Sequence, residues 1–195
     1  MRLNGRAALT AALWLVSSVA HAQSAPTAPT VPPGYGTQVP AFEPPPEPSL
    51  VRQNSVGLRL SIAPGVFIPA NGGSAGFTLG VVAGYGIDVG PVIVTPGVMV
   101  QGSWGSNLTI YSGLGGARVT LPLGNFGPFV EGALGYGNVS GPAGYSKGGL
   151  AIRVGGGFIF FFSRSFALGL TVDYDTITDT PYQTWIIAPT LLISF

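Results

Sequence analysis

The sequence predicts an all-β protein: an eight-stranded antiparallel up-and-down transmembrane β-barrel, preceded by a signal peptide and a proline-rich tether. Three observations support this fold class. Only 8% of the 195 residues are charged, against about 25% in a typical globular domain, while glycine is abundant at 31 residues. No apolar run of about 18 residues follows the N-terminal segment, so no membrane-spanning helix is expected there. Apolar residues instead alternate with small or polar ones through eight segments, as in barrel strands that face lipid.

Residues 1–22 have the three parts of a secretory signal peptide. "MRLNGR" is a positively charged start, "AALTAALWLVSSVA" is an apolar core, and Ala-His-Ala at 20–22 resembles a cleavage site. The core is short for a membrane span, which makes an uncleaved anchor helix the weaker alternative. Cleavage removes Arg2 and Arg6 and leaves six basic against seven acidic residues, a formal charge of −1. This near-neutral charge gives no indication of a nucleic-acid partner.

Residues 23–50 carry nine of the 18 prolines and show no periodicity. Such a segment buries too little apolar area to offset the entropy cost of ordering, so we expect a disordered, extended periplasmic tether. A proline-rich ligand for a periplasmic partner is the functional alternative. The chain has no cysteine, which excludes disulfides and a lipid-modified N-terminal cysteine.

Residues 51–195 are predicted to form the barrel. Clusters of Gly, Pro, Asn, Ser and Asp divide this region into eight segments, each with one consistently apolar register. In the second segment Phe77, Leu79 and Val81 share one face, opposite Thr78 and Gly80. The predicted strands are 54–64, 76–88, 91–102, 107–121, 126–138, 146–161, 166–176 and 183–195.

The connections between these segments alternate in length. Those after even-numbered segments are short: "DVGP", "LGNF" and "FSRSF". Those after odd-numbered segments extend up to "VFIPANGGSAG" (66–76) and "NVSGPAGYSK" (138–147). Short turns are typical of the periplasmic end of a membrane barrel and longer loops of the outer end, so both mature termini are expected in the periplasm. The last strand is expected to pair with the first and leave no open sheet edge.

Aromatic residues concentrate at the ends of the predicted strands. Amphipathic rings settle at the membrane–water boundary, so two aromatic girdles are expected. The predicted periplasmic girdle contains Phe126, Phe160, Phe162, Phe166 and Phe195. The predicted outer girdle contains Trp104, Tyr145, Tyr174, Tyr182 and Trp185.

Together these features resemble the bacterial outer-membrane β-barrel superfamily, in particular the small eight-stranded OmpA-like and OmpX-like barrels, over residues 51–195. The resemblance implies a porin-like barrel fold, outer-membrane lipid as the surroundings, and the outer membrane of a Gram-negative envelope as the location. It also implies that the barrel assembly machinery recognises the last strand. The residues that match this assembly signal are Phe195, Ile193, Leu191 and Ile187. Pro189 departs from the pattern, where a hydrophobic residue other than proline is usual.

The ionisable residues within the strands all occupy the register opposite the apolar one. A charge that faces lipid costs about 2–4 kcal/mol at mid-depth, so these side chains are expected in the lumen. They are Arg59, Arg118, Glu131, Arg153, Asp173 and Asp175. A two-residue turn at 124–125 would place Arg118 directly across from Glu131. A three-residue turn at 163–165 would place Arg153 across from Asp175 and diagonal to Asp173, close enough for ion pairs.

The lumen of an eight-stranded barrel is just wide enough for side chains to fill it. The ion pairs are therefore expected to plug the lumen. The alternative is a narrow conduit for small or hydrophobic molecules, with a lateral opening at Pro96, Pro128 or Pro189, where strand hydrogen bonding is weakened. A soluble secreted β-barrel or sandwich is a third alternative.

No catalytic or metal-binding constellation is predicted. Some eight-stranded outer-membrane barrels modify lipid A, and their chemistry generally requires a histidine beside a serine. The single histidine, His21, lies inside the predicted signal peptide. "DYDTITD" (173–179) lacks the residue spacing of a calcium loop. The expected function is therefore non-enzymatic, without cofactor or metal, in a structural, anchoring or surface-interaction role.

Overall fold

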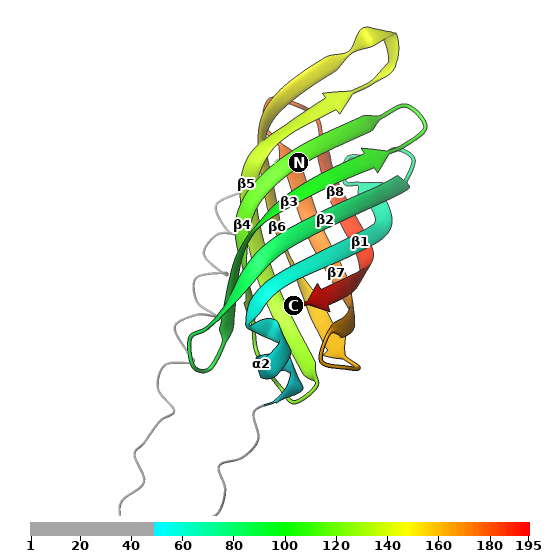
Figure 1. The fold of residues 1–195 in the computed structure, drawn as a ribbon. Helices are drawn as coiled ribbons and strands as arrows, with labels where there is room; N and C mark the ends of the chain where they lie inside the picture. The colour runs from blue at the N-terminus through cyan, green and yellow to red at the C-terminus, as the bar shows by residue number, and fades with distance from the viewer. Residues whose placement is uncertain (1–48) are drawn as a thin grey trace, which may run out of the picture. The chain divides into compact units, whose positions relative to one another are not determined.

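The computed structural model describes residues 49–195, which form a closed eight-stranded antiparallel barrel with a short helix at one end (Figure 1). Neighbouring strands follow one another in sequence order, and the last strand pairs with the first. The predicted fold class is confirmed. The predicted signal peptide and residues 23–48 of the predicted tether lie outside the described residues. Within residues 49–195, no helix is long and apolar enough to cross a membrane.

The observed elements lie close to the predicted segments. The helix is α2 (Leu50–Ser55), and a single 3-10 turn, η1 (Pro142–Gly144), follows the fifth strand. The strands are β1 (Gly57–Pro69), β2 (Gly76–Asp88), β3 (Ile93–Trp104), β4 (Thr109–Thr120), β5 (Phe126–Ser140), β6 (Ser146–Phe161), β7 (Phe166–Ile177) and β8 (Gln183–Ser194).

The prediction was wrong at the start of the barrel. The first strand was expected over 54–64, but residues 50–55 form α2 and β1 extends to Pro69. Ser49 caps the helix, since its side-chain oxygen accepts a hydrogen bond from the backbone N–H of Arg52 at 3.2 Å. The longer β1 takes up the first four residues, 66–69, of the outer loop that was predicted over 66–76.

Both predicted strand registers are confirmed. Leu123 bridges Phe126 around the turn at 124–125, where Gly124 has the positive φ of 64° that such a tight turn requires. The same register continues along β4 and β5 and places Arg118 opposite Glu131. Across the turn at 163–165, β6 and β7 place Arg153 opposite Asp175.

The two faces of the barrel differ in polarity in the sense expected for a membrane. The outward register carries large exposed apolar residues such as Val98, which is 64% exposed, while the inward register carries the charged residues and many Thr, Ser and Gly. A soluble barrel would place its apolar register inside. The arrangement matches a barrel surrounded by lipid.

Prolines interrupt hydrogen bonding in the pair of strands that closes the barrel. Pairing between β1 and β8 stops at Ile62–Leu191 and resumes in the same register at Val66–Ile187. The interruption sets Pro64 opposite Pro189. Neither proline has an N–H to donate, so this step of the ladder loses both of its hydrogen bonds. Both side chains face outward, where they do not disturb the lumen.

Pro96 and Pro128, the two other prolines proposed as sites of a lateral opening, differ from each other in their effect on strand pairing. Pairing between β2 and β3 is interrupted beside Pro96, between Gly84–Gly97 and Ile87–Val94. Pro128 stays in register with Phe158 on β6, and its carbonyl oxygen accepts a hydrogen bond from the N–H of Leu121 at 2.9 Å.

Candidate functional site: a charged lumen covered by helix α2

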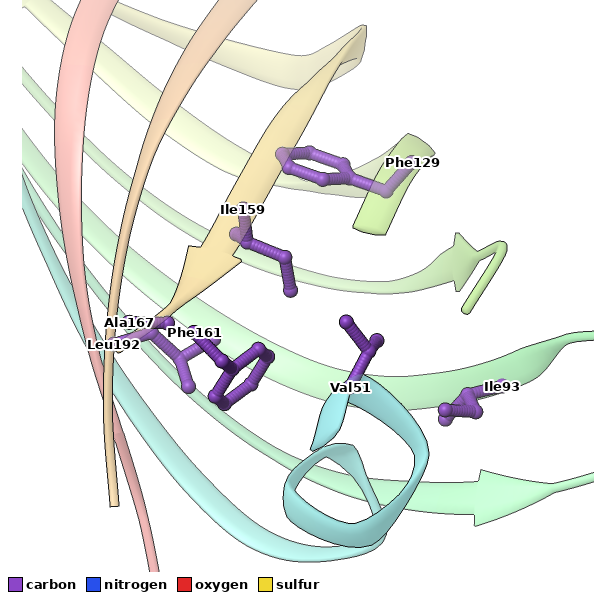
Figure 2. Close-up of a cluster of buried hydrophobic side chains, with 7 residues drawn as sticks. All are labelled: Val51, Ile93, Phe129, Ile159, Phe161, Ala167 and Leu192. Carbon is purple, nitrogen blue, oxygen red and sulfur yellow. The ribbon is translucent and has the colours of Figure 1, made fainter. Parts of the chain in front are cut away.

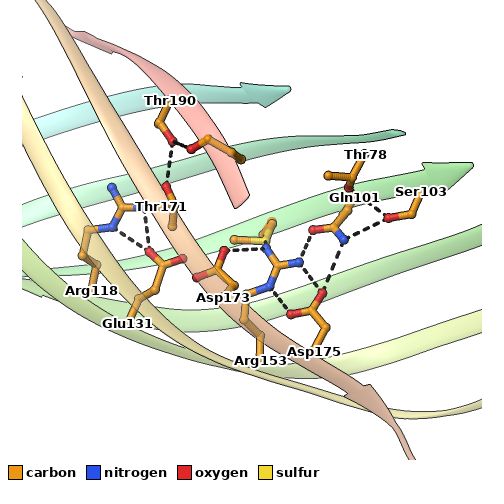
Figure 3. A network of polar contacts seen from close by, with 12 residues as sticks. Thr78, Gln101, Ser103, Arg118, Glu131, Arg153, Thr171, Asp173, Asp175 and Thr190 are labelled. Carbon is orange, nitrogen blue, oxygen red and sulfur yellow. Dashed lines mark hydrogen bonds and ion pairs between the residues drawn. The ribbon is translucent and has the colours of Figure 1, made fainter. Parts of the chain in front are cut away.

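The lumen contains two groups of paired charges at mid-barrel (Figure 3). In the first, Arg118 of β4 contacts Glu131 of β5 through Nε at 2.7 Å and Nη2 at 2.6 Å, both to Oε2. The Arg118 guanidinium also stacks over the ring of Phe129, 4.0 Å from its centroid. The predicted ion pair therefore forms through two donor nitrogens of Arg118, whose guanidinium also packs on an aromatic ring.

The second group is centred on Arg153 of β6. Its Nε donates to Oδ1 of Asp175 at 2.6 Å, and its Nη1 lies 3.9 Å from Oδ2 of Asp173. Gln101 of β3 accepts from Arg153 and donates to Oδ2 of Asp175 at 3.3 Å. Gln101 also donates to Ser103 of the same strand at 3.2 Å. Because Gln101 of β3 bonds Asp175 of β7, the group connects strands on opposite sides of the lumen.

Inward glycines make room for these long side chains. A Cβ on Gly155 would collide with the Asp173 carboxylate, so glycine is needed where Asp173 approaches β6.

The sixth predicted lumen charge has no carboxylate partner in the described residues. Arg59 is 4% exposed, and its Nη2 donates to Oγ1 of Thr95. Its Nε and Nη1 have no hydrogen-bond partner. Arg59 lines a cavity of about 50 Å³ together with Arg118, Glu131 and Thr95.

Helix α2 inserts an apolar side chain into the end of the barrel that carries the short turns (Figure 2). Val51 is 0% exposed. It is the α2 member of a cluster whose other residues face inward from five strands. The cluster comprises Val51, Ile93, Phe129, Ile159, Phe161, Ala167 and Leu192, with Leu50 packed against it.

Polar contacts bind α2 to all three short turns. The N–H of Val51 donates to the carbonyl oxygen of Gly124 at 3.1 Å. Arg52 donates to the carbonyl oxygen of Gly90, and its Nε lies 3.5 Å from Asp88. Asn54 donates to the carbonyl oxygen of Ser163 at 3.4 Å. The helix is thus held over the turn end from three directions.

A second apolar cluster occupies the lumen toward the longer loops. It comprises Met99, Ile110, Leu114, Val139, Ala151, Ile177 and Tyr182. The prediction that Tyr182 belongs to the outer girdle was wrong, because its side chain is only 6% exposed. Asp179, with φ of 61°, turns the loop after β7, and Thr180 accepts the N–H of Tyr182 at 3.1 Å. The ring is thereby directed into the barrel.

The other aromatics proposed for the girdles lie on the outer surface. At the loop end Trp104 donates to the Tyr111 hydroxyl at 3.3 Å, and Tyr174 and Trp185 have ring centroids 5.1 Å apart. Tyr145 is exposed at the same end. At the turn end the exposed predicted residues are Phe126, Phe160, Phe162, Phe166 and Phe195. The sequence analysis missed Tyr111 and Phe158, whose outward register was a usable signal.

The residues proposed as the assembly signal belong to the outward register of β8. Ile187, Leu191 and Phe195 are exposed and Ile193 is half-buried. Phe195 is 76% exposed, and its N–H donates to the carbonyl oxygen of Leu58 at 3.1 Å. The last residue is therefore hydrogen-bonded to the start of β1 while its ring points outward.

Helix α2 is the main feature that sequence reasoning missed. A helix of one and a half turns has no detectable apolar periodicity, and its cap residue lies next to the proline-rich segment. The sequence Pro48-Ser49 before an apolar residue was the one available signal. Within residues 49–195, no three His, Cys, Asp or Glu side chains are grouped so as to hold a metal ion.

No protein-family model matches the chain, and no curated protein is significantly similar to it in sequence. Solved structures do share its fold. Neisserial surface protein A (NspA) superposes with a TM-score of 0.54 at 13% identity, covering 71% of this chain and 96% of that protein. The N-terminal β-barrel domain of Pseudomonas aeruginosa OprF gives 0.50 at 12% identity, covering 70% and 97%. This chain has the fold of the small outer-membrane β-barrels. At such low identity the similarity concerns the fold alone.

Proposed function

We propose that this protein is a non-enzymatic integral β-barrel of the bacterial outer membrane, with a closed lumen and a structural, anchoring or surface-interaction role. The observation that carries the proposal is the contrast between its two faces. The outside carries large exposed apolar side chains on every strand, while the inside carries ion pairs between two apolar clusters. Such a molecule is suited to remaining in lipid without conducting.

The outer surface supports insertion into a bilayer. The strands have 12 to 16 residues, more than the roughly ten that a tilted strand needs to cross the hydrocarbon core. Exposed aromatics lie toward both strand ends, which is the usual position of rings at the two interfaces of a membrane barrel. Outer-membrane lipid is therefore the first proposed partner.

The strand connections support an orientation. All three short turns, α2 and Phe195 lie at one end of the barrel, and the β5–β6 hairpin extends furthest at the other (Figure 1). Periplasmic turns are short in this class of barrel, so we assign the α2 end to the periplasm. We further propose that residues 23–50 lie in the periplasm, where they are available to a periplasmic partner. Phe195 would lie at the periplasmic end, where we propose that the barrel assembly machinery recognises it.

The content of the lumen supports a closed barrel. Glu131 and the two aspartates are held by arginines, and α2 covers the periplasmic end. The absence of His and Cys from residues 49–195 removes the usual general bases and thiolate nucleophiles, which supports a role without catalysis.

One observation favours the second candidate function, a narrow conduit for small or hydrophobic molecules. The β1–β8 ladder is interrupted at Pro64 and Pro189, and a lumenal cavity of about 20 Å³ behind it is lined by Ala63, Ala188 and Thr190. Missing hydrogen bonds make this the weakest step of the closing strand pair. The same cavity is lined by charged residues, which disfavours hydrophobic cargo.

Cell fractionation combined with planar-bilayer recording tests the proposal. We expect recovery in the outer membrane and no current from the reconstituted full mature chain. Discrete channel steps would instead establish the conduit. Recovery in the soluble secreted fraction would refute the membrane assignment.

A further inference from the structure

The guanidinium of Arg59 is a buried charge whose hydrogen-bonding capacity is mostly unused. The side chain is 4% exposed and donates only from Nη2, to Thr95. Its Nε and Nη1 have no partner among the described residues. A buried charge without a counter-charge is strongly destabilising, so an opposite charge bound at this position would stabilise the fold.

The nearby carboxylates are already engaged. Glu131 is held by two nitrogens of Arg118. Asp173 and Asp175, both on β7, are paired with Arg153. None of the three forms an ion pair with Arg59 in residues 49–195.

The cavity beside Arg59 has both the charge and the size for a small anion. Three ionisable side chains line it: Arg59, Arg118 and Glu131. Their formal charges leave one positive charge, which a single monovalent anion would balance. The volume of about 50 Å³ exceeds the roughly 10–15 Å³ that one water molecule needs.

We propose that this cavity binds one small monovalent inorganic anion of halide size. Nε and Nη1 of Arg59 donate to the anion, and Arg118 adds a second positive charge to the cavity lining. Leu192 and Leu114 close the cavity with apolar surface, which lowers the local dielectric and strengthens the attraction to the anion. Water alone would satisfy the donors but would place no negative charge beside Arg59.

Helix α2 determines how the anion enters. Leu192 belongs both to the cavity lining and to the cluster around Val51, so the site lies directly behind the residues that α2 covers. Exchange through the turn end would require displacement of α2. The anion is therefore expected to be taken up during folding and released slowly.

The test compares thermal unfolding of the full mature chain after refolding in detergent with sodium bromide or sodium gluconate at equal ionic strength. Bromide fits the cavity and gluconate does not. The variants are Arg59→Met, which removes the charge at similar length, and Arg164→Met, a matched control in the exposed turn at 163–165.

Binding to the folded state alone raises the unfolding temperature with ligand concentration. We expect the wild type and Arg164→Met to gain stability in bromide relative to Arg59→Met, with the gain rising with bromide concentration. An equal bromide response in Arg59→Met would overturn the proposal. If Arg59→Met does not fold, anomalous diffraction from wild-type crystals grown in bromide decides: a peak beside Nε and Nη1 of Arg59 supports the site, and its absence overturns it.

Discussion

Replacing Glu131 with glutamine should destabilise the barrel by removing the counter-charge of Arg118 while keeping the side-chain volume. The two side chains are 10% and 9% exposed, so the pair is largely shielded from water. Breaking a buried pair by removing one partner costs about 3–5 kcal/mol. Because a cavity of about 50 Å³ beside the pair can admit water to the stranded arginine, we expect the lower end, about 3 kcal/mol.

The assay is reversible urea unfolding of the detergent-folded barrel, followed by tryptophan fluorescence. A double variant, Arg118→Met with Glu131→Gln, leaves neither charge and should recover part of the loss. Asp179→Ala in a loop should cost less than Glu131→Ala, although the φ of 61° at Asp179 adds backbone strain to that comparison. Arg164→Ala, in an exposed turn, is the cleaner control. Equal losses for Glu131→Gln and Arg164→Ala would refute a stabilising Arg118–Glu131 pair.

Three further predictions concern the β1–β8 strand pair, helix α2 and the C-terminus. Pro189→Ala restores an N–H opposite the carbonyl oxygen of Pro64 and should stabilise the barrel by about 0.5–1.5 kcal/mol in the same assay. No gain would mean that β1 and β8 cannot form this hydrogen bond. Val51→Asp places a carboxylate in the apolar cluster, so α2 should detach and the barrel should lose stability in the same assay, whereas Val56→Asp at an exposed position should change the stability little; equal losses would mean that packing of Val51 does not hold the helix. Deleting Phe195 should impair membrane insertion in cells before it lowers stability in detergent, and the reverse order would remove its role as an assembly signal.

The ion pairs were predictable because turn length and strand period together determine register. Once Gly124 forms a two-residue turn, every partner along β4 and β5 follows, and Arg118 must lie opposite Glu131. The inward direction of each charge follows equally from a period of two and the cost of a charge in lipid. These are properties of one strand or one hairpin, so the sequence contains them.

Tyr182 and Arg59 show where such reasoning ends. Tyr182 was assigned to the outer surface because it is an aromatic next to a strand end, but its loop directs the ring inward. Arg59 was expected to join the lumen ion pairs, but it forms none with a carboxylate of residues 49–195. Both outcomes depend on contacts between strands that are far apart in the sequence.

The sequence by itself determined an eight-stranded barrel, the registers of its β4–β5 and β6–β7 hairpins and the polarity of its two faces. Alternation and turn chemistry act locally, so they need no knowledge of the closed barrel. The tertiary structure decided which residues meet inside the barrel and in its wall. Val51 of α2 lies across the turn end, and Pro64 lies opposite Pro189 in the β1–β8 pair. Arg59, which forms no ion pair within residues 49–195, lies beside a cavity. Closure and strand tilt bring these residues to a common level, and only the complete set of strands defines that geometry.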